Sequence, residues 1–240
     1  MIGCSKLLPV LIFGIVLSAV CTADDKPISF SADRMSGAAG KKDEKTVLSG
    51  HASVSVGSLR ITGDEIELSG TDFRYVKAFG NVTGVDSEQG FSFTADILTY
   101  DRETETASFQ GSAKLVDTKH DVETSAGLIV YNKQTEIAQL QTGVKLKRKN
   151  IDCVSEFALY RRSVSMLDLT GKPVVTRDGD EFKANRITVN LETEFITLDG
   201  SVSGKLKETK KKEEAGSKAA SPASGDAGAG SSASASGDVD

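Results

Sequence analysis

A repeat of about 30 residues constrains this chain more than any other feature of its sequence. Six pairs of residues, each beginning with a small residue and most ending in a polar one, interrupt stretches in which apolar and polar residues alternate. The pairs are Ala32-Asp33, Gly63-Asp64, Ala95-Asp96, Ala126-Gly127, Ser155-Glu156 and Ala184-Asn185. Their second members lie 31, 32, 31, 29 and 29 residues apart. A fixed period of this kind predicts stacked units, because one such unit cannot bury its own apolar face.

Six glycines keep the same period and phase as the pairs. They are Gly50, Gly80, Gly111, Gly143, Gly171 and Gly200, and they lie 30, 31, 32, 28 and 29 residues apart. Two departures stand out, both in the fourth unit: Gly127 replaces the polar member of the pair, and Gly143 lies one residue out of register. Two markers with one period make chance a poor explanation of the repeat.

The alternation inside each unit is typical of β-strands. The best-preserved copy is Phe91 to Gly111, in which Phe93, Leu98, Tyr100 and Phe109 fall on one face. No window of eleven or more residues shows a helical stripe. We therefore predict an all-β body of about twelve or more short strands, with turns rich in Asp, Asn and Gly and no helix beyond the N-terminal segment.

The equivalent apolar positions of all units predict one continuous interior wall. No helix is expected to cap either end of the stack, so each end leaves a strand edge to which another chain can add. Residues 24–208 form the predicted repeat domain.

The two ends of the chain differ from the repeats. Residues 1–23 have the layout of a secretory signal peptide, with an apolar run from Leu7 to Val20 and small residues before a cut ahead of Asp24. An uncleaved membrane anchor and lipidation at Cys21 are the alternatives. Residues 209–240 begin with Lys and Glu and continue as a Ser/Ala/Gly tract, so we expect a disordered tail.

Composition and motifs argue against an enzyme and against a nucleic-acid-binding protein. The net charge is −5, so the basic footprint of a nucleic-acid site is missing. His51 and His120 lie in different units and form no metal motif, and we expect neither a metal nor a cofactor. Cys153 takes the inward position that Phe93 has in its own unit, which predicts a buried structural cysteine.

Two charged features have a structural and a functional interpretation. The carboxylates Asp33, Asp64, Asp96 and Glu156 recur once per unit, so we expect them to accept backbone hydrogen bonds where the strand bends rather than to act as catalytic acids. The basic run Lys145–Lys149, with Arg161-Arg162 one strand later, is either a solvated face or a site for anionic head groups or an acidic partner.

The repeat resembles the OstA-like repeat of the LptA family of periplasmic lipopolysaccharide-transport proteins. Phe91–Gly111 followed by Ala113-Lys-Leu carries the resemblance best, and Gly50-His-Ala-Ser-Val and Gly80-Asn-Val-Thr are similar versions of the glycine junction. The resemblance covers residues 28–206. It implies a twisted, open β-jellyroll whose V-shaped interior holds acyl chains. It also implies end-to-end pairing through edge strands, with other copies and with inner- and outer-membrane partners.

The leading hypothesis is therefore a periplasmic carrier for lipopolysaccharide or a similar glycolipid. Its lipid-binding wall is predicted to consist of Ile66, Leu68, Phe93, Leu98, Tyr100, Phe109, Ile129 and Tyr131. Ordinary sealed core is the alternative at each of these positions. A structural or adhesive β-solenoid without lipid is the second hypothesis, and a polysaccharide-acting β-helix is a distant third because it requires clustered carboxylates.

Overall fold

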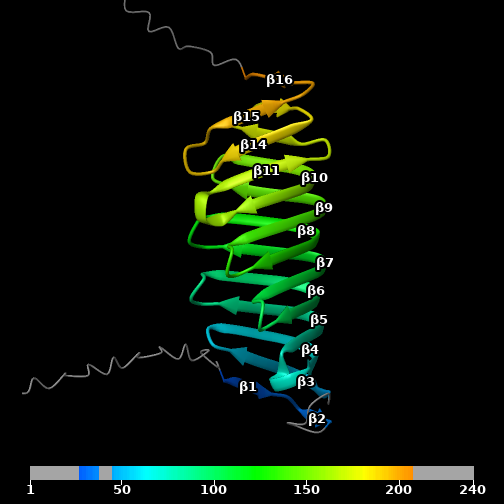
Figure 1. The fold of residues 1–240 in the computed structure, drawn as a ribbon. Helices are drawn as coiled ribbons and strands as arrows, with labels where there is room; N and C mark the ends of the chain where they lie inside the picture. The colour runs from blue at the N-terminus through cyan, green and yellow to red at the C-terminus, as the bar shows by residue number, and fades with distance from the viewer. Residues whose placement is uncertain (1–26, 38–44, 208–240) are drawn as a thin grey trace, which may run out of the picture. The chain divides into compact units, whose positions relative to one another are not determined.

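The computed structural model describes residues 27–37 and 45–207, which form one antiparallel sheet of 16 strands (Figure 1). The predicted signal peptide and the predicted tail lie outside the described residues. The described part contains no α-helix and only two three-residue 3-10 turns, η1 (Thr71–Phe73) and η2 (Arg162–Val164). Nothing in the described part is a helix long and apolar enough to cross a membrane. The predicted all-β class is confirmed.

Eight long strands of 11 or 12 residues make up the middle of the sheet, and each pairs with the next along the chain. They are β3 (Thr46–Val56), β4 (Leu59–Ser69), β5 (Tyr75–Asp86), β6 (Phe91–Asp101), β7 (Thr106–Asp117), β8 (Val122–Asn132), β9 (Ile137–Arg148) and β10 (Ile151–Arg161). Each unit of the sequence repeat therefore contributes two strands, joined by a hairpin turn.

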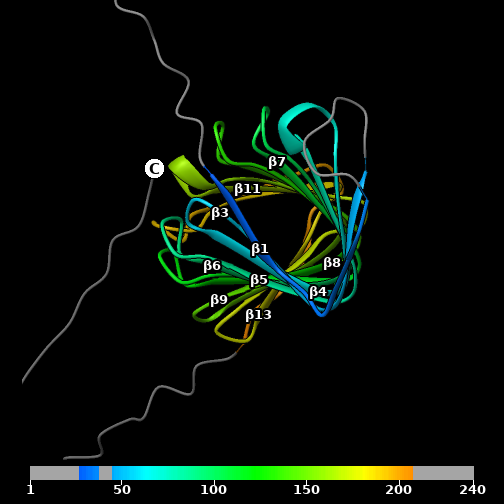
Figure 2. The same ribbon diagram turned by 90° about the horizontal axis from the view of Figure 1, so that it is seen from below.

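Every long strand bends near its middle, so the sheet folds into two walls (Figure 2). The pairing register shifts at the bend, for example between Thr94 and Ile97 of β6, where Ala95 and Asp96 lie. The bend on the neighbouring strand falls at Gly111 and Ser112, whose φ angles are +72° and +45°. Glycine tolerates a positive φ, which explains why it recurs at the bend.

The two sequence markers are partners in space. A Cβ on Gly111 would lie 2.1 Å from the Asp96 carboxylate, and one on Gly80 would lie 2.4 Å from that of Asp64. In every unit except the fourth, the polar side chain at the corner therefore covers a bare glycine of the adjacent strand. Two of the carboxylates contact side chains rather than backbone amides: Asn81 Nδ2 donates to Asp64 Oδ2 at 3.0 Å, and His51 Nδ1 lies 2.7 Å from Asp33 Oδ2. The structural role is as expected, but the donor is different.

The fourth unit reverses this arrangement. Thr142 (φ +69°) occupies the place of the glycine, and Gly143 (φ +64°) follows it. Gly127 then stands where the other units carry a polar side chain, and a Cβ there would lie 3.1 Å from Thr142 Cβ. A small residue is needed on one side of the contact, and this unit places it on the other strand.

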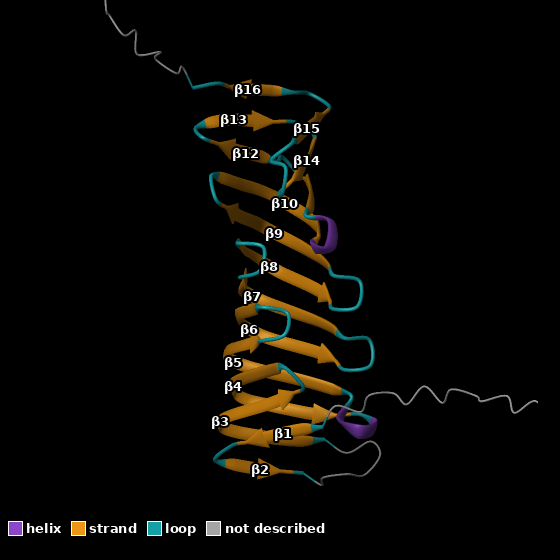
Figure 3. Ribbon diagram, turned by 90° about the vertical axis from the view of Figure 1, so that its left-hand side faces the viewer, coloured by secondary structure: helices purple, strands orange, loops and turns teal. Residues whose placement is uncertain are grey.

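The terminal units have the same two walls built from separate short strands. At the start, β1 (Ile28–Ser31) pairs with one half of β3 and β2 (Arg34–Ser36) with the other half. At the other end, one wall continues through β11, β14 and β15 and the other through β12, β13 and β16 (Figure 3). Their bounds are Met166–Thr170 (β11), Val174–Arg177 (β12), Asp180–Lys183 (β13), Arg186–Asn190 (β14), Ile196–Asp199 (β15) and Ser203–Lys205 (β16).

Hairpin turns gather along two edges of the folded sheet. The Asp117 edge consists of the turns at 57–58, 87–90, 118–121, 149–150 and 178–179, with the strand ends beside them. The Arg162 edge consists of the turns at 70–74, 102–105, 133–136, 162–165 and 191–195. Successive turns of one edge are hydrogen-bonded, as from Thr118 N–H to Gly90 O (2.9 Å) and from Lys133 N–H to Glu105 O (3.0 Å).

Candidate functional site

The interior between the two walls is lined mainly by apolar side chains along the stack of described strands. Residues paired across neighbouring strands form rows, because cross-strand partners share a face of the sheet. One row of one wall contains Ile66, Ala78, Leu98, Phe109, Ile129, Leu140, Ala158, Leu169 and Ile187. All of them are buried. The predicted continuous interior wall is present.

A second row of the same wall alternates tyrosine with alanine. Across β6 to β10 it reads Tyr100, Ala107, Tyr131, Ala138 and Tyr160. The small alanines leave room for the rings of the neighbouring strands. Burial raises the pKa of Tyr100 and of Tyr131 to about 12, and it raises that of Tyr160 further. All three side chains are therefore neutral hydroxyl groups at physiological pH.

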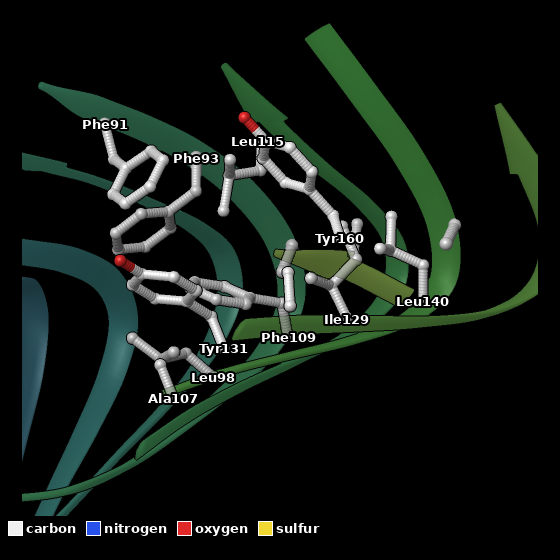
Figure 4. Close-up of a cluster of buried hydrophobic side chains, with 14 of the residues drawn as sticks. Phe91, Phe93, Leu98, Ala107, Phe109, Leu115, Ile129, Tyr131, Leu140 and Tyr160 are labelled. Atoms are coloured by element: carbon white, nitrogen blue, oxygen red, sulfur yellow. The ribbon is translucent and has the colours of Figure 1, made fainter. Parts of the chain in front are cut away.

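The opposite wall contributes aromatic rings that meet both rows. The Phe93 and Phe109 ring centroids are 4.7 Å apart, and the Phe91 ring stands edge-on to Tyr131 at 4.9 Å (Figure 4). Phe93 lies over Gly84 of the adjacent strand β5, where a Cβ would come 2.2 Å from the Phe93 Cζ. Gly84 thus makes room for the ring that closes the interior on this side.

Little free space remains inside. A cavity of about 40 Å³ is lined by Phe91, Phe93, Tyr100, Phe109 and Tyr131 among others, and one of about 10 Å³ lies beside Ile129, Tyr131 and Tyr160. Since a water needs roughly 10–15 Å³ by the same measure, these spaces hold a few waters at most. An acyl chain enters this interior only if the walls move apart.

The two edges meet along a line, here called the seam, that polar side chains cross. Arg162 of one edge donates to Asp117 Oδ2 of the other (2.6 Å) and to the Gln89 carbonyl (2.8 Å), and its guanidinium lies 4.6 Å from the Phe91 ring centroid. Glu136, on the same edge as Arg162, accepts a third contact at 3.0 Å. Arg162 and Asp117 are 4% and 1% exposed, so this ion pair is part of the interior.

A second pair crosses the seam one unit earlier. Lys133 Nζ lies 3.2 Å from Asp86 Oδ2 and 3.4 Å from Glu88 Oε2. Burial favours the neutral form of Asp86, but hydrogen bonds from the Gln89 amide and the Ser58 hydroxyl, and the charge of Lys133, outweigh it and lower its pKa. We call Arg162–Asp117 and Lys133–Asp86 the seam ion pairs.

All eight residues of the predicted lipid-binding wall lie in the interior. Phe93, Tyr100, Phe109 and Tyr131 line the larger cavity, and Ile129 lines the smaller one. Ile66, Leu68 and Leu98 are buried as well, but they line neither cavity. Their binding of lipid remains a prediction.

Sequence reasoning missed the seam ion pairs. The sequence places Arg162 beside the basic run Lys145–Lys149, whereas in the structure Arg162 is buried and its partner Asp117 lies 45 residues away in the chain. The available signal was that Asp117 takes the last inward position of a strand whose other inward positions are apolar. The remaining run is a mixed surface, because Glu123 and Asp152 are the cross-strand neighbours of Lys147.

The other polar residues singled out in the sequence have structural surroundings. His51 Nδ1 lies 2.7 Å from Asp33 at the first bend, and His120 Nδ1 lies 2.9 Å from Asp117 in a turn. Cys153 is buried, and burial raises its pKa to about 12, so it stays a thiol. No group of His, Cys, Asp or Glu among the described residues is arranged to hold a metal ion.

Comparison with known proteins gives one family match. The model of the family described as "LptA/(LptD N-terminal domain) LPS transport protein" matches residues 31–137 and 135–195. No curated protein sequence matches the chain. Among solved structures, the chain is similar to LptH of Pseudomonas aeruginosa, the LptA-homologous periplasmic component of the lipopolysaccharide transport device. That similarity has 13% identity and a TM-score of 0.24, and it covers 76% of this chain and 96% of LptH.

Proposed function

Because the chain belongs to the LptA and LptD N-terminal domain family of lipopolysaccharide-transport proteins, we propose that it is a periplasmic carrier for a glycolipid. The cargo is lipopolysaccharide or a similar acylated glycolipid, moved from the inner toward the outer membrane. The protein itself is no enzyme in this proposal. Its interior provides the path along which the lipid moves, and a partner ATPase supplies the energy for transport.

One observation carries the proposal: the interior is lined mainly by apolar side chains along the stack of described strands, and it is bounded by two edges that the sheet does not close. Both edges consist of hairpin turns, and no pair of described strands joins one edge to the other, so the folded sheet is open along the seam. Acyl chains gain roughly 25 cal/mol for each Å² of apolar surface that they bury, so such an interior favours them at every level of the stack.

The ends of the stack support the proposed partners. Phe30 and Met35 belong to the inward face of the first unit, yet they are 44% and 43% exposed, because no described strand lies over them. Strands β1 and β15 end the hydrogen-bonded order on either side. Edge-strand addition of a second copy, or of inner- and outer-membrane members of the pathway, would cover these groups.

A second function has one observation in its favour. The interior is closely packed, with about 40 Å³ in its larger cavity, as expected for a structural or adhesive β-solenoid without cargo. The two functions differ in whether the walls part to admit lipid.

Mass spectrometry of the full chain purified from its native envelope tests the proposal. We expect a co-purifying acylated glycolipid in wild type, and loss of most of it in Ala107→Leu, which fills the larger cavity. Ser108→Leu is the matched control, since the next residue of β7 faces outward and should keep the lipid. Lipid-free wild-type protein, or equal lipid in both variants, would favour the structural role.

A further inference from the structure

The seam ion pairs stand where the two edges of the folded sheet meet beside the interior. Asp86 and Lys133 line the larger cavity together with its aromatic rings, and Asp117 and Arg162 line the smaller one. The members of each pair belong to opposite edges of the folded sheet. Parting the edges to admit an acyl chain therefore separates Arg162 from Asp117 and Lys133 from Asp86.

Separation has an electrostatic consequence that limits which ligands can enter. A buried charge that loses its partner is strongly unfavourable, and Arg162 and Asp117 are almost fully buried. A neutral amphiphile would leave the guanidinium without its carboxylate from the opposite edge. A ligand that carries a phosphate or carboxylate next to its acyl chains would replace the lost carboxylate, since guanidinium groups bind such anions through two parallel hydrogen bonds.

Two hydroxyl groups beside Arg162 also favour a ligand with oxygen acceptors. Tyr131 and Tyr160 line the smaller cavity with Arg162, and their hydroxyl groups are buried without a hydrogen-bond partner among the described residues. Buried polar groups are normally paired, so an unpaired group calls for an explanation. Ester, amide or phosphate oxygens at the head of an acyl chain would accept from both.

We infer that the seam is an anion-exchange site: Arg162 and Lys133 release Asp117 and Asp86 and bind the anionic group of the incoming lipid. The inference rests on the proposed function and names the class of its ligand, an anionic amphiphile whose charge lies close to its acyl chain. Asp117 and Asp86 act as competitors that hold the seam closed in the empty protein.

The two members of one ion pair should then have opposite effects on binding. The full chain is titrated with dodecyl phosphate, and with dodecyl maltoside as a neutral probe of equal chain length, by displacement of the neutral fluorophore N-phenyl-1-naphthylamine. Arg162→Gln should weaken dodecyl phosphate binding about tenfold, the loss expected for one charge-assisted contact. Asp117→Asn should strengthen it by a similar factor, because the competitor is gone. Dodecyl maltoside binding should change little in either variant.

Control variants separate this effect from general loss of stability. Arg161→Gln and Asp168→Asn break an ion pair of the same chemistry, with Nη1 and Oδ2 2.7 Å apart, that joins two strands of one wall and does not cross the seam. They should leave both probes unaffected. If the Arg162 or Asp117 variants fail to fold, Lys133→Met and Asp86→Asn provide the same opposed pair at a less buried position.

The outcomes distinguish the inference from the function on which it rests. Wild-type protein that binds neither probe overturns the proposed function and this inference together. Binding of both probes with equal affinity, or weakening of dodecyl phosphate in both Arg162→Gln and Asp117→Asn, overturns the inference alone and leaves a lipid-binding interior. Opposed changes confined to the anionic probe support it.

Discussion

At the scale of the residue, the bend of each unit depends on a contact between one bare glycine and one polar side chain of the adjacent strand. Gly111 has a positive φ and faces the Asp96 carboxylate, whereas a Cβ on Gly143 would meet nothing within 4 Å. The fourth unit shows that the contact tolerates an exchange of sides but still requires one small partner. The glycine spacing in the sequence therefore reports a steric requirement.

Alanine substitutions at these two glycines should differ in cost. Gly143→Ala should lower the free energy of unfolding by about 1–2 kcal/mol, because alanine at this position must adopt the left-handed backbone conformation. Gly111→Ala should lower it clearly more, because its Cβ also collides with the Asp96 side chain. Asp96→Gly should recover part of the loss in the Gly111→Ala background. Urea unfolding measures all three. Equal costs, without recovery, would show that the corner contact is not what selects glycine.

In the tyrosine row, by contrast, we predict a substitution that stabilises the protein. Tyr131→Phe removes a buried hydroxyl that has no partner among the described residues, so the free energy of unfolding should rise by about 1 kcal/mol. Tyr75→Phe is the control, since Tyr75 is 41% exposed and should change nothing. Thermal denaturation of lipid-free protein is the measurement. A clear loss of stability in Tyr131→Phe would mean that the hydroxyl is already satisfied.

At the scale of the element, strand ends follow a rule that the sequence displays. Asp86, Asp101 and Asp117 each end a strand and accept backbone N–H groups of the turn that follows, as from Glu103 to Asp101 at 3.0 Å. Asn132 and Asn190 do the same in later turns. Short-range patterns of this kind, together with strict alternation, made strands, turns and the inward face predictable.

The seam could not be predicted in the same way. Arg162 contacts Gln89 and Asp117, which precede it by 73 and 45 residues. The alternation of inward and outward residues shows only that such residues lie near the ends of strands, and not which strand ends meet. Whether residues of the two edges come into contact depends on the angle between the walls, and the bends of the strands set that angle. The same limit applies to the interior volume, because alternation identifies the lining but not the distance between opposing walls.

The turn that follows β6 gives a prediction about pH. Arg74 donates to both oxygens of Asp101, at 2.9 and 2.7 Å, and lowers the pKa of that carboxyl to about 2. A carboxyl whose pKa is lowered on folding stabilises the protein above its unfolded pKa of about 3.9, and the contribution is lost as pH falls toward about 2.

Asp101→Asn should therefore make the free energy of unfolding less dependent on pH at acid pH. The variant is expected to lose less than about 1 kcal/mol near neutral pH, since the pair is partly exposed, and to show a shallower decline between about pH 4 and 2. Urea unfolding at a series of pH values measures this. A decline parallel to that of wild type would assign the acid sensitivity to other groups.

At the scale of the whole repeat domain, the stack has an apolar interior and two ends that no described element covers. The sequence predicted this property from the recurrence of the units. It follows that end-to-end association should depend on inward residues of the terminal unit rather than on outward residues of the middle.

Phe30→Glu and Phe157→Glu test this dependence with a matched pair. Phe30 is 44% exposed on the inward face of β1, and Phe157 is 52% exposed on the outward face of β10. Sedimentation equilibrium should show self-association that Phe30→Glu weakens at least tenfold, as for a central interface residue. Phe157→Glu should have no effect. Equal loss in both variants would indicate nonspecific association.

The passage of lipid through the interior is tested most directly by photo-crosslinking. A photoreactive phenylalanine analogue is placed at Phe93, inside, or at Phe157, outside, in cells that make the native glycolipid. The proposed function predicts lipid crosslinked at position 93 and none at position 157 in equally folded proteins. Crosslinking at 157 alone, or at neither position, would contradict a lipid path between the two walls.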